Sequence, residues 1–420
     1  MYLLLLLLCP AVLAGRMETL YAWTHVDFTF PTEALRDAYI ANGDFVPKNN
    51  LIIDVDVWSG YNGEGRKLFV TLPKTKPGTP VTLATVSDLK RNGVTLLQPF
   101  PDWSWHRGDC DGITSVFRTH VDRCGRLWVI DSGVVDVFNT FQRKCQPQVL
   151  VFDLHTDSLI KRYTIPDSNL DQDSLLINIA VDTRTADCSD AHAYLSDVTS
   201  FKLIVYDLEN DRSWRVSSNY FYPYPLHGDF HVGGKYFNLM DGLFGLALGP
   251  IRTNGDRTLY FHSLASVRES WVSTSVIRNH SLFSEDPGAS PRSFHVFDTT
   301  RSSQSAAEDM TDGGVLIYSL VGDNAIGCWN SHLPYRKQNL DVIAKDDIAL
   351  QFQSGLKVYG NLVWSLSSRF QNFYLDEVPE DEINYRINVG RLTDLLRHTR
   401  CDHRSSSGSS SSLQLSFKSP

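Results

Sequence analysis

The sequence predicts an all-β, six-bladed β-propeller, and three observations support this prediction. A short apolar strand recurs six times, a second apolar strand precedes each copy, and 11% of the 420 residues are aromatic. Aromatic and β-branched residues favour strands, and repetition at a period of a few tens of residues is typical of propellers and other repeat architectures. Radial closure of such repeats leaves only short edges exposed, which suits a long all-β chain.

The recurring strands define the units of the predicted propeller. They cover residues 68–70, 127–129, 193–195, 259–261, 316–318 and 362–364. The strands that precede them begin near Leu51, Ile113, Asn178, Leu243, Gln304 and Ser354. Small uncharged segments such as 179–181 suit the crowded innermost position of a blade, where both faces are buried. A third strand follows in several units, as at 149–154 and 203–208. Two separate β-sandwiches are the alternative, but they do not explain six matching strand pairs.

The two ends of the chain differ from the repeats. Residues 2–9 form an apolar run that is followed by small residues up to Ala14, which predicts a signal peptide over residues 1–14. A membrane anchor is the alternative, but the run is too short to cross a bilayer. We therefore expect a secreted, extracellular protein without a membrane partner. The propeller is expected over residues 15–400, and the Ser-rich residues 401–420 are expected to be a disordered tail.

The cysteines predict a disulfide framework. Six cysteines remain after the signal peptide: Cys110, Cys124, Cys145, Cys188, Cys328 and Cys401. An even number in a secreted chain indicates three disulfides, but spacing does not choose among the 15 possible pairings. No C-x-x-C pair is present, and the Pro and Gly around His227 and His231 predict a loop rather than a helical metal site. No metal site is expected.

Charge and short motifs limit the partners. The formal net charge is −9 and no Lys/Arg-rich stretch is present, which argues against a nucleic-acid partner. The sequon at Asn279 predicts a surface glycosylation site. The sequence has no nucleophile elbow, no H-E-x-x-H motif and no P-loop. We therefore expect no cofactor, and any reaction has to use side chains alone.

Several motifs together resemble one known family. The segments that carry the resemblance are 110–116, 121–133, 241–247, 272–274, 327–330 and 362–370. In this order they are similar to the insect yellow / major royal jelly protein family, over roughly residues 18–400. The resemblance implies a six-bladed propeller, secretion and conserved disulfides, with Cys328 and Cys401 as one pair.

The resemblance implies several functions, because the family is divided. Some yellow proteins convert dopachrome to dihydroxyindole in melanin formation, salivary members bind biogenic amines without chemistry, and royal jelly members are nutritional proteins. We predict dopachrome conversion, an isomerase-type reaction on a small aromatic molecule (an indole or catechol derivative). The alternatives are a non-catalytic binder of serotonin and dopamine, and a structural pigmentation protein.

Candidate catalytic residues follow from the chemistry of tautomerisation, which needs a base and a donor for the developing oxyanion. His106 stands just before the innermost strand of the second unit and is a candidate base, although local packing among tryptophans would also explain it. Asp111 and Asp241 each precede a glycine where an innermost strand is expected. Either carboxylate could act as a base or hold an ammonium group, or it could simply cap a tight turn.

Candidate ligand-binding residues come from residue chemistry and from the family resemblance. Phe244 could stack on an aromatic ligand. The resemblance to the amine binders implies that Phe370 stacks on the ligand, with Gln353 and Ser354 nearby. Ser368 occupies a position that is usually Asn or Asp, which implies a weakened hydrogen bond there and argues against tight amine binding.

Overall fold

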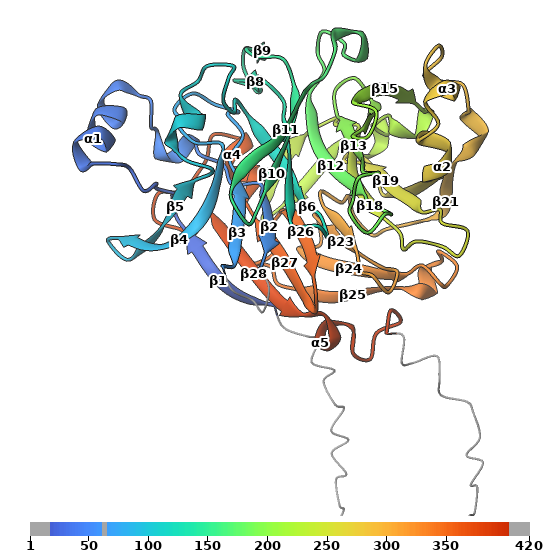
Figure 1. Cartoon of the computed structure of the whole chain (residues 1–420). Coiled ribbons are helices and arrows are strands. Elements are labelled where there is room, and N and C mark those ends of the chain that lie inside the picture. The colour runs from blue at the N-terminus through green and yellow to red at the C-terminus, as the bar shows by residue number, and fades with distance from the viewer. Residues whose placement is uncertain (1–16, 61–64, 403–420) are drawn as a thin grey trace, which may run out of the picture.

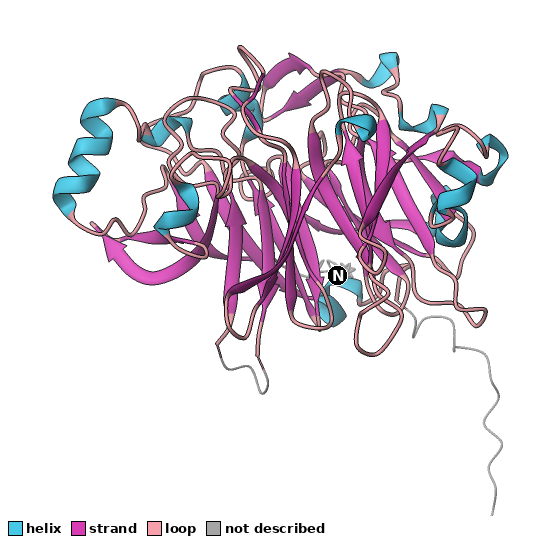
Figure 2. Cartoon of the chain, turned by 45° about the horizontal axis from the view of Figure 1, so that its top comes forward, coloured by secondary structure: helices cyan, strands magenta, loops and turns pink. Residues whose placement is uncertain are grey.

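The chain folds into six four-stranded antiparallel sheets arranged as a β-propeller (Figures 1 and 2). The computed structural model describes residues 17–60 and 65–402. The expected signal peptide and most of the expected tail lie outside these residues. Each innermost strand contacts the innermost strands of its two neighbours, and the contact between the first and the sixth closes the ring.

The blades follow the chain in order. Blade 1 contains β2 (Asp54–Trp58), β3 (Lys67–Thr71), β4 (Leu83–Arg91) and β5 (Val94–Pro99), and blade 2 contains β6 (Val116–Val121), β7 (Arg126–Asp131), β10 (Gln148–Asp153) and β11 (Ser158–Thr164). Blade 3 contains β12 (Leu176–Asp182), β13 (His192–Asp197), β14 (Lys202–Asp207) and β15 (Arg212–Ser217), and blade 4 contains β18 (Leu243–Leu248), β19 (Thr258–Ser263), β20 (Arg268–Ser273) and β21 (Phe294–Thr300). Blade 5 contains β22 (Glu308–Met310), β23 (Val315–Leu320), β24 (Ala325–Asn330) and β25 (Leu340–Lys345), and blade 6 contains β26 (Gln353–Tyr359), β27 (Leu362–Ser367), β28 (Tyr385–Arg391) and β1 (Glu18–Trp23).

The predicted strand pairs are confirmed. Each of the six recurring segments falls within the second strand of a blade, and the innermost strands begin within four residues of the expected positions. The sequence did not reveal how the ring closes. The first strand of the chain, β1, pairs antiparallel with β28 and becomes the outermost strand of the last blade. The first and the last strand of the chain are therefore joined by hydrogen bonds within one sheet.

The hydrophobic core is divided among the contacts between neighbouring blades. Phe69 of blade 1 and Val129 of blade 2 belong to one buried cluster. Between blades 4 and 5, the rings of Tyr260 and Trp329 meet edge to face with centroids 5.5 Å apart. Because each sheet buries both faces against its neighbours, the second and third strands are almost continuously apolar, as in other fully buried sheets.

A polar side chain at the end of the second strand holds the start of the innermost strand in several blades. Asp131, Asp197 and Ser319 are fully buried and play this part in blades 2, 3 and 5. They accept hydrogen bonds from the backbone N–H groups of Thr114 and Ser115, of Leu175, and of Ala306 and Ala307, respectively. These bonds fix the end of the channel at which the innermost strands begin.

Helices and short hairpins lie at the two axial ends of the propeller. The helices are α1 (Glu33–Asn42), α2 (Thr274–Ile277), α3 (His280–Phe283), α4 (Phe370–Tyr374) and α5 (Leu392–Leu396). The hairpins are β8 (Val134–Val135) with β9 (Gln142–Arg143), and β16 (Asp229–Val232) with β17 (Lys235–Asn238). Figure 1 shows β8 and β9 at the opposite end of the molecule from α5. None of the helices in the described part of the chain is long and apolar enough to cross a membrane.

Three disulfides connect the predicted cysteines. The pairs are Cys110–Cys145, Cys124–Cys188 and Cys328–Cys401, and the last is the pair that the family resemblance implied. Cys401 is fully buried. Cys401, the first residue of the expected tail, is therefore held against the folded part of the chain.

Removing the Cys328–Cys401 disulfide is expected to destabilise the closed ring. The bond joins blade 5 to Cys401 across 73 residues, a span that includes the strands β26, β27 and β28 of blade 6. Closing a loop of this length removes entropy from the unfolded chain and is worth about 4 kcal/mol. The double variant Cys328→Ser/Cys401→Ser is therefore expected to unfold at a clearly lower urea concentration, with Cys110→Ser/Cys145→Ser as the comparison for a shorter loop. An unchanged unfolding midpoint would contradict this role.

Candidate functional site

Two cavities follow the axis of the propeller, and the first is apolar. We call it the aromatic cavity; it has a volume of about 230 Å³ and lies where the innermost strands begin. It is lined by Leu51, Ile53, Pro73, Thr75, Phe117, Arg118, Val137, Phe138, Phe141, Leu175, Ile177, Val198, Thr199, Leu239, Asp241, Phe244, Leu264, Phe352, Ser354, Phe370 and Tyr374. A concave site with mainly apolar walls and a few polar groups is the usual form of a small-molecule site.

Aromatic rings form one wall of the aromatic cavity. Phe370 begins α4, and its ring centroid lies 4.7 Å from that of Phe352 and 6.1 Å from that of Phe138. Tyr374, one turn later on α4, meets Phe138 edge to face and donates a hydrogen bond of 3.1 Å to the carbonyl of Asn238. The wall therefore joins blade 6, the β8–β9 loop and the end of β17.

Asp241 is the one acidic residue among the lining residues of the aromatic cavity. It immediately precedes the Gly242–Leu243 start of blade 4, and its backbone carbonyl accepts a hydrogen bond from Ala265. Within the described part of the chain, no side chain forms an ion pair or hydrogen bond with its carboxylate. Desolvation raises the pKa of Asp241 to about 7. A carboxylate with such a pKa can exchange a proton near neutral pH.

Arg118 separates the aromatic cavity from the rest of the channel. Its side chain is buried and borders both axial cavities. Nη2 donates to the carbonyls of Ala306 and Ser354, at 2.7 and 2.6 Å, and the guanidinium carbon lies 4.7 Å from the Phe244 ring centroid. Nη1 of Arg118 and the hydroxyl of Ser354 have no hydrogen-bond partner among the described residues. Unused donors therefore remain at the floor of the cavity.

The second cavity, which we call the polar channel, has a volume of about 490 Å³ and continues along the innermost strands. Lys357 of blade 6 lies among Asp54, Asp56 and Asp309, whose carboxylates raise its pKa. Burial in turn raises the pKa of Asp54 and Asp309, and that of Asp56 to about 7. The Lys357 ammonium acts against burial and lowers the pKa of all three carboxyl groups, so the opposite charges partly compensate one another near the axis.

The structure places His106 away from both cavities. It ends a short 3-10 helix at Trp103–His106, and its Nε2 lies 3.1 Å from the carbonyl of Phe100. Burial and the nearby Lys74 ammonium lower the pKa of His106 to about 3. This histidine is therefore neutral and inside local packing, which is the alternative that the sequence left open.

Three other candidate residues also lie outside the aromatic cavity. Asp111 is exposed, and its backbone carbonyl accepts a hydrogen bond from Arg162. Gln353 is buried and its Nε2 donates to the carbonyl of Leu350. Ser368 is buried, and its N–H and hydroxyl donate to the carbonyl of Phe352. Ser368 thus positions a lining residue rather than lining the cavity itself. Asp241, Phe244, Ser354 and Phe370 are the candidates that the fold brings together.

The remaining predicted sites lie apart from the channel mouth. His231 stacks on Tyr236 with ring centroids 4.1 Å apart, and His227 lies at the end of a 3-10 helix, so the two histidines are on different elements. Asn279 is exposed, as the sequon predicted, and its side-chain oxygen accepts a hydrogen bond from Ser281. Its glycosylation stays a prediction.

The sequence reasoning missed Arg118, Phe138 and Tyr374. Arg118 gave a usable signal, because it is a charged residue inside an innermost strand, where small or apolar residues are expected. Phe138 and Tyr374 gave none, because a loop and a short helix from blades far apart in the sequence bring them together.

Comparisons with known proteins agree with the motifs. The family model described as "Major royal jelly protein" matches residues 114–401. The proteins named "Protein yellow" from Drosophila yakuba and Drosophila melanogaster are each 39% identical over 411 residues, which cover 96% of this chain and 73% of each relative. Among solved structures, virginiamycin B lyase from Staphylococcus aureus aligns over 81% of this chain and 95% of its own, with 11% identity and a TM-score of 0.42. That structural likeness is too low to support an inference about function.

Proposed function

This chain belongs to the major royal jelly protein family, and from that premise we propose that it is a secreted yellow-type protein that converts dopachrome to dihydroxyindole in its aromatic cavity. The strongest support is the placement of Asp241. It is a single carboxylate in an apolar cavity lined with aromatic rings, and its pKa is raised to about 7. Planar bicyclic substrates match such walls, and a base with this pKa operates at neutral pH.

The proposed reaction needs no external oxidant or reductant. Dihydroxyindole differs from dopachrome by the loss of carbon dioxide, while two electrons pass within the ring system to the two quinone oxygens. Asp241 removes the proton of a ring carbon, and the bonding pair moves toward a quinone oxygen, which then takes up a proton. The carboxylate leaves as carbon dioxide, its bonding pair completes the aromatic ring, and the second oxygen is protonated. The atoms and electrons of substrate and products balance without a cofactor.

Arg118 supports the same reaction from the floor of the aromatic cavity. The hydrogen bonds of Nη2 to Ala306 and Ser354 hold the guanidinium in place before a ligand arrives. Negative charge that develops on a quinone oxygen is stabilised by such a fixed positive group in a site of low polarity. Nη1, which has no partner among the described residues, is the donor available after a small adjustment of the side chain.

The disulfides support the secreted location. All six cysteines of the described residues are paired. Disulfides of this kind persist in oxidising compartments and are rare in the cytosol. The apolar run at residues 2–9 provides the matching export signal.

Non-catalytic amine binding is the second candidate, because the same residues fit it. A carboxylate beside aromatic rings attracts the ammonium of an aromatic amine such as serotonin. The argument against this candidate that came from Ser368 no longer applies, because Ser368 does not line the cavity. Ligand chemistry rather than cavity shape has to distinguish the two.

The purified full chain is expected to accelerate the loss of dopachrome's visible absorbance with saturation kinetics. Phe244→Ala removes a ring from the cavity wall and is expected to raise KM about tenfold, since such ring contacts are worth about 1 kcal/mol beyond the area they bury. Tyr236→Ala is the matched control, because this ring is 74% exposed and outside the cavity lining.

Calorimetric titration with serotonin and dopamine completes the test. Tight amine binding without acceleration of dopachrome loss would contradict the proposed enzyme activity and support non-catalytic amine binding. If the protein neither binds these amines nor accelerates dopachrome loss, the structural pigmentation role remains.

A further inference from the structure

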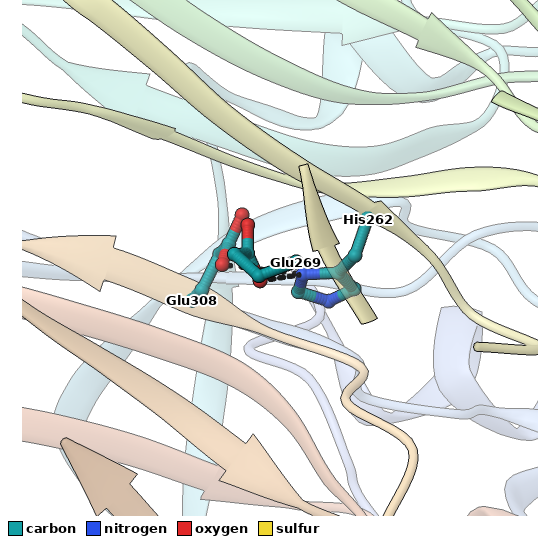
Figure 3. Close-up of side chains that lie close together, drawn as sticks. All are labelled: His262, Glu269 and Glu308. Atoms are coloured by element: carbon teal, nitrogen blue, oxygen red, sulfur yellow. Dashed lines mark hydrogen bonds and ion pairs between the residues drawn. The ribbon is translucent and has the colours of Figure 1, made fainter. Parts of the chain in front are cut away.

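Three potential metal ligands meet inside the wall between blades 4 and 5. Figure 3 shows His262 of β19, Glu269 of β20 and Glu308 of β22 with their polar ends together. Nδ1 of His262 lies 3.1 Å from Oε2 of Glu269 and 3.2 Å from Oε2 of Glu308. All three side chains are fully buried. The sequence gives no sign of this cluster, because Glu308 follows much later in the chain than His262 and Glu269.

The second ring nitrogen of His262 determines what Nδ1 can do. Nε2 lies 3.1 Å from the carbonyl of Ser305, so the network assigns the Nε2 proton to this bond. In the neutral ring, Nδ1 then presents a lone pair to two carboxylate oxygens. Three lone pairs at this spacing repel one another unless a positive species lies between them. A histidine held by a backbone carbonyl on its other nitrogen is also the usual arrangement of a metal-ligating imidazole.

The hydrogen bonding of the carboxylates is incomplete. Neither oxygen of Glu308 accepts a hydrogen bond from the described residues, nor does Oε1 of Glu269. Arg301 donates to Oε2 of Glu269 and holds that side chain in place. A proton on Nδ1 would be shared between two oxygens, whereas a metal ion would engage one oxygen of each carboxylate and the ring nitrogen at once. Buried carboxylates without partners are costly and call for such compensation.

The surroundings leave room for the imidazole and connect the cluster to solvent. Gly245 of β18 faces the ring, and a Cβ at this position would come within 2.3 Å of Cε1 of His262. Glu308 also lines the polar channel, from which an ion and a water molecule could enter.

We propose that His262, Glu269 and Glu308 bind one divalent transition-metal ion, with zinc as the best match. Imidazole and carboxylate are established zinc ligands, and four-coordinate bonds of about 2.0 Å place neighbouring ligand atoms about 3.3 Å apart. The separations of 3.1 and 3.2 Å between Nδ1 of His262 and the two carboxylate oxygens are close to this value. Three protein ligands leave one position for water from the polar channel, so the site is of the open kind.

The experiment uses the untagged full chain, secreted from cultured cells, stripped with a chelator and titrated with zinc chloride. Calorimetry is expected to show one zinc per chain, and elemental analysis after gel filtration is expected to find the same ratio. Glu308→Gln is expected to weaken zinc binding at least a hundredfold. Asp309→Asn is the matched control: it is the next residue on the same strand and also lines the polar channel, but lies outside the cluster.

A second measurement keeps the test decisive if Glu308→Gln does not fold. X-ray absorption at the zinc edge of the wild-type protein is expected to show one imidazole with oxygen ligands and no sulfur. Absence of stoichiometric zinc would overturn the proposal and assign the central position to a proton on His262. Several imidazoles around the metal, or equal zinc binding by wild type and Glu308→Gln, would also overturn it.

Discussion

Asp241→Asn is expected to lower the rate of dopachrome conversion by about a hundredfold or more, with little change in KM. Loss of a positioned general base typically costs this much. Asparagine keeps the size and shape of the side chain but cannot accept the proton. Because the wall of aromatic rings is unchanged, the substrate still binds, and the loss falls on kcat.

The pH dependence gives an independent check on Asp241. Desolvation raises its pKa to about 7, so the ionised base is present above this pH. Wild-type kcat/KM is therefore expected to rise as the pH increases through about 7, and the residual activity of Asp241→Asn is expected to lack this step. Asp229→Asn is the control, because it makes the same substitution at an exposed residue of the nearby β16–β17 hairpin. An unchanged pH profile in Asp241→Asn would remove this residue from the mechanism.

Thermal stability shows whether Asp241 carries a cost in the folded state. A carboxyl whose pKa is higher in the folded than in the unfolded chain binds more protons when folded, so stability falls as the pH rises between about 4 and 7. Asp241→Asn removes this penalty. The variant is expected to melt above the wild type at pH 8, with a smaller difference at pH 4. A folded and stabilised variant without activity would separate the chemical role of Asp241 from a structural one.

Asp131→Ala is expected to lower the free energy of unfolding by about 4 to 6 kcal/mol. Asp131 is fully buried and accepts four hydrogen bonds. The donors are the backbone N–H groups of Thr114, Ser115 and Gly133 and the side-chain amide of Gln148, at 2.7 to 3.1 Å. Each buried donor left without a partner costs about 1 to 3 kcal/mol. These bonds anchor the start of β6, so the variant is expected to loosen blade 2.

Urea unfolding measures this effect, and the same blade supplies the control. Asp153 lies at the end of the neighbouring strand β10 and accepts exposed hydrogen bonds from the backbone N–H groups of His155 and Thr156. In Asp153→Ala, water replaces the lost carboxylate as their acceptor. Its midpoint is expected to stay near that of the wild type. Equal destabilisation by Asp131→Ala and Asp153→Ala would show that burial of the acceptor does not matter here.

The strand pairs were readable from the sequence because burial inside a blade demands local apolar runs. Segments such as 127–129 and 193–195 carry the signal within a few residues, whatever their partners are. The pairing of β1 with β28 was not readable, because it depends on where the two ends of the chain meet once all six blades have formed.

The candidate site was only partly readable for the same reason. Asp241, Phe244, Ser354 and Phe370 lie at or near the starts of blades or in a family motif, and the fold brings them to one cavity. His106 had the chemistry of a base but not the position, and its placement depends on the packing around Phe100.

The sequence by itself determined the number of blades, the cysteines available for disulfides and the residues that open each innermost strand. These features depend on local patterns of burial and on residue type. Only the tertiary structure decided which side chains meet on the axis, which cysteines pair, and that His262, Glu269 and Glu308 converge within one buried wall. The physical reason is that ring closure sets distances between residues that are far apart in the chain, and no local pattern encodes such distances.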